Sequence, residues 1–260
     1  MSQRPSFPAR INLAPGSPAS AKKPASPASA PARTDSPLAA GAAGLDSGAI
    51  RHRMVMKLAA QGVNDARVLA ALGEVQRHRF IDSALGNQAY EDTSLPIGLG
   101  QTISKPSVVA RMIELLLAGQ CDSTGRLGRV LEVGTGCGYQ AAVLSRVCSE
   151  VYSIERLRGL HEKARENLRA FRVANLHLLF GDGRLGYAKG APYAGIIAAA
   201  GGEAIPQAWI DQLGVGGRII APTLRPDGRQ ALVVVEKTAR EVKQTVLEAV
   251  HFVPLKSGIA

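Results

Sequence analysis

A glycine-rich turn between a buried strand and a helix is the feature that most constrains the fold of this 260-residue chain. In the run RVLEVGTGCGYQ, at 129–140, Gly134, Gly136 and Gly138 follow a short apolar stretch and precede a helical pattern. Glycines allow the backbone to turn sharply and to approach a ligand closely. A strand, a glycine turn and a helix in this order are typical of the ligand-binding edge of an α/β sheet.

The pattern around this turn predicts an α/β fold, Rossmann-like and doubly wound. Strands are expected at 130–133, 151–154, 176–180 and 195–199, in the run GVGGRIIAP, and at 231–236 and 245–252. Helices are expected at 139–147, 157–171 and 206–213. Such alternation gives a mostly parallel sheet with helices on both faces. The last two strands should pair antiparallel, because their short polar link is too short for a parallel crossover.

An N-terminal helical part should precede this core. We expect helices at 50–60, at 65–72 with Asn64 or Asp65 as cap, at 80–85, and at 107–117 with Pro106 in its first turn. The run DTSLPIGLGQTISKP, at 92–106, is rich in Gly, Pro and Thr and predicts a loop. Residues 49–260 are therefore read as one globular domain, with a helical part at 49–128 and a sheet core at 129–260.

Residues 1–48 differ in composition from this domain. They hold eight of the 15 prolines, and most of the rest is Ala and Ser. A segment with so little to bury cannot offset the entropy of ordering. We predict a disordered tail, which would be either an inert linker or a basic tether.

Charge and cysteine content bound the classes of partner. The formal net charge is +10; five basic and two acidic residues leave +3 before residue 49 and a dispersed +7 after it. With only 4% aromatic residues, this favours a generally basic surface over a nucleic-acid-binding face. Three cysteines without a C-x-x-C, and five histidines without ligand spacing, predict no disulfide framework and no metal site. With no signal peptide and no membrane span expected, the chain is predicted to be cytoplasmic.

Three acidic residues follow the ends of consecutive predicted strands. Glu132 lies two residues before Gly134, Glu155 ends the second strand, and Asp182 stands in the Gly-Asp-Gly turn after the third. The carboxyl ends of parallel strands meet at one edge, so we expect these acids to share one pocket. They suit a ligand with a ribose, an amino group and a positive centre, and they would repel a pyrophosphate. This favours S-adenosylmethionine over NAD or ATP, although Glu155 could also be a solvated charge at a helix start.

The chain resembles the protein-L-isoaspartate O-methyltransferase family. The resemblance is carried by QTISKP, LEVGTGCGYQAAVL, VYSIER, GDGRLGY, APYAGII, IPQAWIDQL, GGRIIAP and HFVPL, in this order, and covers roughly residues 50–255. It implies a methyltransferase domain at 49–260 that uses S-adenosylmethionine to esterify the carboxylate of isoaspartyl residues in damaged proteins. The ester would then collapse to a succinimide, which reopens partly to aspartate. We expect a monomer that acts on peptides and proteins, with no nucleic-acid or membrane partner.

The resemblance also implies roles for individual residues. Ser104 corresponds to the active-site serine, which makes it the candidate catalytic residue. Residues 253–255 correspond to the substrate cleft, namely Val253, Pro254 and Leu255. The implied cofactor-binding residues are Thr102, Ile103, Ser104, Glu132, Gly134, Gly136, Gly138, Glu155, Arg156, Asp182 and Gly183. Without the resemblance, Ser104 could instead be read as a helix cap.

The chain departs from the family pattern in a few places. Ala194 stands where the family usually has Asp, and Ala198 and Ala199 replace a common Thr-Ala. Cys137 stands where Ser is common and is read as a small packing residue, not a nucleophile. The alternative functions are a methyltransferase for RNA or a small molecule, a nicotinamide-dependent reductase, and a binding protein without catalysis.

Overall fold

The computed structural model describes residues 48–260, so the predicted tail lies outside the described residues, apart from Gly48. The α-helices are α2 Gly48–Ala60, α3 Ala66–Glu74, α4 Pro106–Leu117, α5 Tyr139–Val147, α6 Arg158–Arg169 and α7 Gln207–Gln212. Short 3-10 helices are η2 Arg77–Phe80, η3 Ser83–Gln88, η4 Gly183–Leu185 and η5 Ala188–Gly190. None of the helices in this part of the chain has the length and apolar character needed to cross a membrane.

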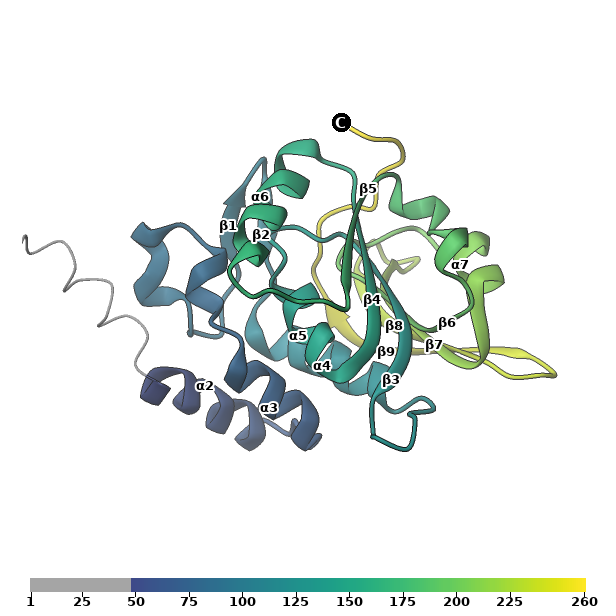
Figure 1. Cartoon of the computed structure of the whole chain (residues 1–260). Coiled ribbons are helices and arrows are strands. Elements are labelled where there is room, and N and C mark those ends of the chain that lie inside the picture. The colour runs from purple at the N-terminus through teal and green to yellow at the C-terminus, as the bar shows by residue number, and fades with distance from the viewer. Residues whose placement is uncertain (1–47) are drawn as a thin grey trace, which may run out of the picture. The chain divides into compact units, whose positions relative to one another are not determined.

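The strands form a small hairpin and one large sheet. The hairpin pairs β1 Leu95–Gly98 with β2 Gln101–Ile103. The large sheet contains β3 Leu127–Val133, β4 Cys148–Glu155, β5 Leu176–Phe180, β6 Tyr193–Ala198, β7 Leu213–Leu224, β8 Gln230–Lys237 and β9 Val242–Val250. Its order is β5-β4-β3-β6-β7-β8-β9; the β7–β8 and β8–β9 pairs are antiparallel, and the other pairs are parallel (Figure 1). The predicted Rossmann-like α/β fold and the antiparallel last pair are confirmed.

Strand order reverses between β3 and β6. The chain runs outward from β3 through β4 to β5 and then returns to the other side of β3 at β6. The loops after β3 and β6 consequently diverge and open a crevice at the carboxyl edge of the sheet, which is where α/β folds bind ligands. The glycine turn follows β3 directly and thus lies in this crevice.

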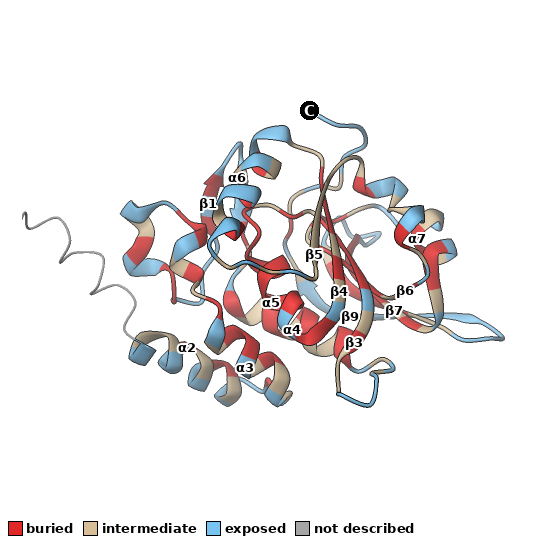
Figure 2. Cartoon of the chain, in the orientation of Figure 1, coloured by how far each residue is buried: buried red, intermediate tan, exposed pale blue. Residues whose placement is uncertain are grey.

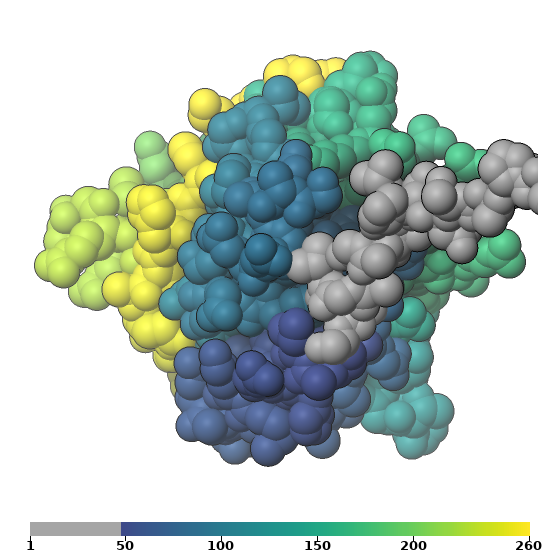
Figure 3. Space-filling model, turned by 90° about the vertical axis from the view of Figure 1, so that its left-hand side faces the viewer, coloured from purple at the N-terminus to yellow at the C-terminus, as the bar shows by residue number. Residues whose placement is uncertain are grey.

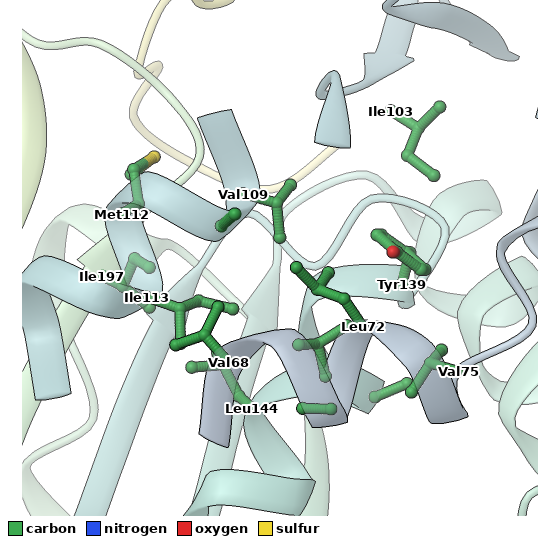
Figure 4. Packing of buried hydrophobic residues seen from close by; sticks show 14 of the residues in the cluster. Val68, Leu72, Val75, Ile103, Val109, Met112, Ile113, Tyr139, Leu144 and Ile197 are labelled. Carbon is green, nitrogen blue, oxygen red and sulfur yellow. The ribbon is translucent and has the colours of Figure 1, made fainter. Parts of the chain in front are cut away.

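The sheet carries a separate apolar cluster on each face. Alternate residues of a strand point to opposite faces, and in β3 Val130 joins one cluster while Leu131 and Val133 join the other. The first cluster contains residues of α3, α4 and α5, as Figure 4 shows for Val68 and Leu72 beside Ile113 and Leu144, and also residues of α6. The second lies under α7 with the buried Trp209. The central strands are therefore buried on both faces (Figure 2).

Two local predictions in the helical part are wrong. The expected helix at 80–85 is interrupted, because the Asp82 carboxylate accepts the Ala84 N–H and starts a new 3-10 turn. The expected loop at 92–106 contains the β1–β2 hairpin. Its strands have four and three residues, and its tip uses left-handed backbone at Gly98, Leu99 and Gly100. Such short strands lack the alternating pattern by which sequence reasoning recognises a strand.

Candidate active site

A cavity of about 470 Å³, called here the main cavity, opens at the carboxyl edge of β3, β4 and β6. Its volume lies within the roughly 300–1,000 Å³ that small-molecule sites occupy. One wall is the glycine turn with the residues that follow β4 and β5. The opposite wall is the β1–β2 hairpin with Ser104. These two walls come from segments far apart in sequence, and the fold brings them together.

The glycine turn contains backbone conformations that a residue with a side chain would adopt only under strain. Gly136 has φ +57° and Gly138 has φ +92°, both in the left-handed region that glycine tolerates. A Cβ on Gly136 would lie 3.2 Å from Ile97 Cδ1 of the hairpin, whereas one on Gly138 would lie 2.8 Å from Leu168 Cδ1 of α6. Gly134 and Gly136 line the main cavity, whereas Gly138 caps the amino end of α5 and is buried against α6. Gly138 therefore allows helix packing, and the first two glycines shape the pocket.

Glu155 is the acid that faces the main cavity. It is 5% exposed, and its Oε2 accepts the Gly136 N–H at 2.9 Å while Oε1 accepts the Leu157 N–H at 2.9 Å. A carboxylate oxygen can accept more than one hydrogen bond, so both oxygens keep acceptor capacity for a ligand. Glu155 thus fixes the glycine turn and presents negative charge to the cavity.

Glu132 lies beneath the glycine turn and does not line the main cavity. It is fully buried, and its Oε2 accepts a hydrogen bond from Ser153 Oγ, which lies 2.6 Å from Thr135 Oγ1. The period of two along β3 turns its side chain toward the face that α5 covers, away from the opening. Burial raises its pKa to about 8, so the group is mostly protonated at neutral pH. The expectation that Glu132 shares one pocket with Glu155 is therefore wrong, because Glu132 does not line the cavity.

Asp182 follows β5 at the rim, but its carboxylate is already engaged. Oδ1 accepts the Arg184 N–H at 2.8 Å, and Oδ2 accepts the Gly258 N–H at 2.6 Å. Arg156 Nε donates to Gly258 O at 2.9 Å, so both residues hold the segment 256–260 against the rim. Arg156 and Gly183 line the main cavity, whereas Asp182 does not.

The hairpin wall carries the predicted active-site segment. Thr102, Ile103 and Ser104 all line the main cavity. Ser104 is half-buried, and among residues 48–260 no hydrogen bond is found for its Oγ. It does not cap α4: Lys105 is the cap residue, and the Asp92 carboxylate accepts the Ser107 N–H instead. The cap reading of Ser104 is therefore wrong, and its hydroxyl is available to a ligand.

A second cleft of about 740 Å³ adjoins the main cavity. It runs between α4 and the end of β9 with residues 251–253, and it shares Thr102, Ser104, Ala199 and Val253 with the main cavity. Figure 3 shows the two sides of this region next to each other, the C-terminal residues in yellow and the hairpin segment in blue. Val253, Pro254 and Leu255 line the main cavity, and backbone hydrogen bonds of Val253 O and Leu255 N with Gly201 hold them there. Ser104 stands where the two spaces meet.

Several lining residues were not predicted from the sequence. Ile97, Leu99 and Gln101 come from the unrecognised hairpin, and Gln140 has a buried Nε2 with no hydrogen-bond partner among the described residues. Cys137 also lines the cavity, and burial raises the pKa of its thiol to about 11, which keeps it a protonated packing residue. The described residues contain no cluster of His, Cys, Asp and Glu that could hold a metal ion.

The departure at Ala194 lies away from this site. Ala194 is the second residue of β6, at the amino end of the strand, and it lines neither the main cavity nor the second cleft. Ala199, after the carboxyl end of β6, lines both. A substitution at position 194 therefore does not change the walls of either space.

The strand order reverses between β3 and β6, and the cavity opens there, between the glycine turn and the hairpin. With Glu155 at the end of β4, this arrangement is that of a Rossmann-like S-adenosylmethionine-dependent methyltransferase. The model of the protein-L-isoaspartate(D-aspartate) O-methyltransferase family matches residues 49–260, and the chain belongs to that family.

Individual relatives agree with this assignment. The protein-L-isoaspartate O-methyltransferase of Methylibium petroleiphilum is 63% identical over 217 residues, which cover 83% of this chain and 80% of the relative. That of Ralstonia nicotianae is 56% identical over 239 residues, covering 87% and 74%. A solved protein-L-isoaspartate O-methyltransferase superposes with a TM-score of 0.72 at 29% identity, covering 80% of this chain and 67% of that one.

A further solved structure supports the fold. A putative protein-L-isoaspartate O-methyltransferase from Plasmodium falciparum, in complex with S-adenosyl-L-homocysteine, superposes with a TM-score of 0.67 at 21% identity and covers 79% of this chain and 98% of that one. Family membership favours the methyltransferase reading over the reductase reading raised by the glycine turn.

Proposed function

We propose that this chain transfers a methyl group from S-adenosylmethionine to the free carboxylate of isoaspartyl residues in damaged proteins, with Ser104 orienting that carboxylate. The observation that carries the proposal is the position of Ser104 at the junction of two spaces, one sized for a nucleoside and one open to a chain. Ser104 lines both spaces, and among the described residues no hydrogen bond is found for its hydroxyl.

The residues of the main cavity fit the cofactor. Glu155 has spare acceptor capacity for a ribose diol. The cavity also has an apolar side, suited to a flat base, that contains Ile154, Leu157 and Leu160. When bound, S-adenosylmethionine supplies an electrophilic methyl group on a positively charged sulfur. Gly134, Gly136, Gly183, Arg156 and the segment 102–104 complete the proposed binding set; Glu132, Gly138 and Asp182 would support it from outside the cavity.

The protein has little acid–base work to do in this reaction. A carboxylate is already ionised at neutral pH, so no general base is needed. What the protein must supply is placement of the reacting atoms roughly 3–3.5 Å apart and in line. The Ser104 hydroxyl would donate a hydrogen bond to the oxygen that does not react. Exclusion of water by Ile103, Ala199 and Val253 would strengthen this contact, since a low-dielectric site strengthens hydrogen bonds.

The second cleft is the proposed path of the substrate chain. An isoaspartyl residue carries the peptide through its side chain, so the substrate must lie extended past the reacting group. The cleft leads from Ser104 along α4 and the end of β9, and Val253, Pro254 and Leu255 would line the substrate at the junction. Its open form predicts acceptance of flexible peptides with little sequence preference.

A pair of peptides that differ only in an isoaspartyl or aspartyl linkage tests the proposal. With labelled S-adenosylmethionine, we expect base-labile label in the isoaspartyl peptide and none above background in its twin. Equal labelling of both, or labelling of RNA instead, would contradict it. We further propose a cytoplasmic monomer without nucleic-acid or membrane partners, which sedimentation and fractionation of the full chain would test.

A further inference from the structure

Arg77 is a fully buried cation in the helical part of the molecule. It is 0% exposed, and none of the described residues forms an ion pair with it. Burial lowers the pKa of the guanidinium, which nevertheless stays charged at neutral pH. A buried charge without an ionic partner is costly unless hydrogen bonds replace its hydration. The contacts that Arg77 makes must therefore be specific ones.

These contacts join both ends of one segment. Arg77 Nε donates to Ala89 O at 2.9 Å, and Nη2 donates to Ser104 O at 2.8 Å, with Thr93 O at 3.5 Å from the same nitrogen. Ala89 and Thr93 precede the β1–β2 hairpin, and Ser104 follows it. One planar guanidinium thus closes the base of the hairpin that forms a wall of the main cavity.

The same guanidinium also contacts the opposite wall. Its Cζ lies 4.8 Å from the centroid of the Tyr139 ring, and Tyr139 is the first residue of α5 after the glycine turn. A cation over an aromatic face is attractive, more so when the pair is shielded from water. Tyr139 lines the main cavity, whereas Arg77 does not. Arg77 therefore ties the hairpin to the glycine-turn wall from behind.

We propose that Arg77 is a positioning residue for the methyl transfer, which holds the Ser104 backbone in register with the glycine turn. The inference rests on the proposed role of Ser104. Lysine cannot replace the guanidinium fully, because an ammonium lacks the planar fork that reaches carbonyls of separate segments. Loss of the fork lets the hairpin base open and moves the Ser104 hydroxyl away from the carboxylate.

A double-mutant cycle distinguishes this role from a general contribution to stability. Arg77→Lys should lower kcat for an isoaspartyl peptide about tenfold in the wild-type background. In the Ser104→Ala background the same change should lower kcat less than twofold, because the hydroxyl that Arg77 positions is gone. Groups that act as a unit show this non-additivity. Full additivity of the two losses would overturn the proposal.

Two further variants keep the test decisive. Arg77→Gln removes the buried charge and keeps an amide donor, so it should fold even if the lysine variant does not. Its kcat should fall at least tenfold at a temperature where unfolding measurements show the variant fully folded. Arg126→Lys is the matched control: Arg126 also binds carbonyls, those of Ser145 and Cys148, but at the other end of the sheet. It should keep wild-type kcat. A folded Arg77→Gln variant with wild-type kcat would refute the role of Arg77 and leave the proposed function intact. A wild-type protein that does not methylate the isoaspartyl peptide would refute the proposed function.

Discussion

The two walls of the main cavity are built in different ways. The glycine-turn wall is fixed by its own backbone: β3 and β4 lie in the parallel sheet, and Glu155 binds the turn directly through the Gly136 N–H. The hairpin wall has two short strands that pair only with each other, and it is held from outside by Arg77. Lys163 Nζ of α6 also donates to Ile97 O at 2.9 Å, so the hairpin wall is held by side chains of other segments and can shift as a unit. We infer that the first wall governs retention of the cofactor and the second governs delivery of the carboxylate.

Removal of the Glu155 carboxylate should produce the largest effect and should fall on the cofactor. Glu155→Ala leaves the Gly136 and Leu157 N–H groups without acceptors and removes the negative charge that faces the cavity. Hydrogen bonds to charged groups contribute about 1.5–3 kcal/mol each, so the Kd for S-adenosylhomocysteine should rise about 100-fold. Isothermal titration measures this directly. An unchanged Kd would show that the glycine-turn wall does not control retention.

The buried Glu132 gives the glycine-turn wall a pH-dependent support. Its folded-state pKa, about 8, lies above the ordinary value of 4.5, so the folded protein holds the proton more tightly than the unfolded chain. The stabilisation is complete below pH 4.5 and is lost as the pH rises through 8. When the folded protein binds one proton more than the unfolded chain, the free energy of unfolding falls by about 1.4 kcal/mol per pH unit. Between pH 6 and pH 8 the loss amounts to about 2 kcal/mol, because the proton is partly released near pH 8.

The isosteric change Glu132→Gln tests this support. The amide cannot lose a proton, so the free energy of unfolding of the variant should fall less between pH 6 and pH 8 than that of the wild type, by about 2 kcal/mol. Urea titrations at several pH values measure it. Glu150→Gln is a control on the neighbouring strand β4, because the Glu150 side chain is exposed by more than a third. Parallel profiles for wild type and Glu132→Gln would mean that Glu132 is ionised in the folded protein.

Ser104→Ala should separate the two walls most clearly. The change removes the hydroxyl at the junction but leaves the Ser104 carbonyl that Arg77 binds, so the hairpin should stay in place. We expect kcat to fall about tenfold, as for loss of one positioned hydrogen bond of about 1.4 kcal/mol. The Kd for S-adenosylhomocysteine should change less than threefold. A large rise in this Kd with an unchanged kcat would assign Ser104 to the cofactor instead.

The same difference explains which features the sequence predicted. The strand before the glycine turn, the helix at 139–147 and the strand at 176–180 follow from local patterns, and the last two match α5 and β5 in both bounds. Gly134, Gly136 and Glu155 were likewise placed at the cavity, since their positions depend on neighbours in sequence. Glu132 was predicted at the cavity because it stands near the end of β3. Alternate residues of a strand point to opposite faces, and the side chain of Glu132 points to the face that carries Val130.

The hairpin wall could not be predicted by the same reasoning. β1 and β2 are too short for periodicity, and the contacts that fix them come from distant residues: Arg77, 27 residues before Ser104, and Lys163. The sequence around Arg77, RHRF, reads as an exposed basic run. A buried arginine that binds carbonyls leaves no local signal, because its partners are backbone atoms whose positions depend on the fold. The Asp182–Gly258 contact was missed for the same reason.

The smallest effect is expected for Lys105, which extends the hairpin wall into the second cleft. Lys105 is exposed, follows Ser104 directly and makes no ion pair with any described residue. The neighbouring cation Arg111 is already paired with Glu248 at 3.1 Å. Lys105 therefore offers an unneutralised charge to the substrate chain. Exposed ion pairs are worth up to about 1 kcal/mol, so Lys105→Gln should raise KM two- to threefold for an isoaspartyl peptide flanked by glutamates.

Two controls, high salt and a substitution of Lys57, test whether the rise in KM of Lys105→Gln comes from the second cleft. Screening at about 1 M salt shortens the range of exposed charges to about 3 Å, so the difference in KM between Lys105→Gln and wild type should disappear there. Lys57→Gln removes the same charge from the last turn of α2, outside both spaces, and should leave KM unchanged at low salt. If Lys57→Gln raised KM as much as Lys105→Gln, attraction would come from the net charge of the molecule. The second cleft would then have no charge preference of its own, and the contribution of the hairpin wall would be limited to the positioning of Ser104.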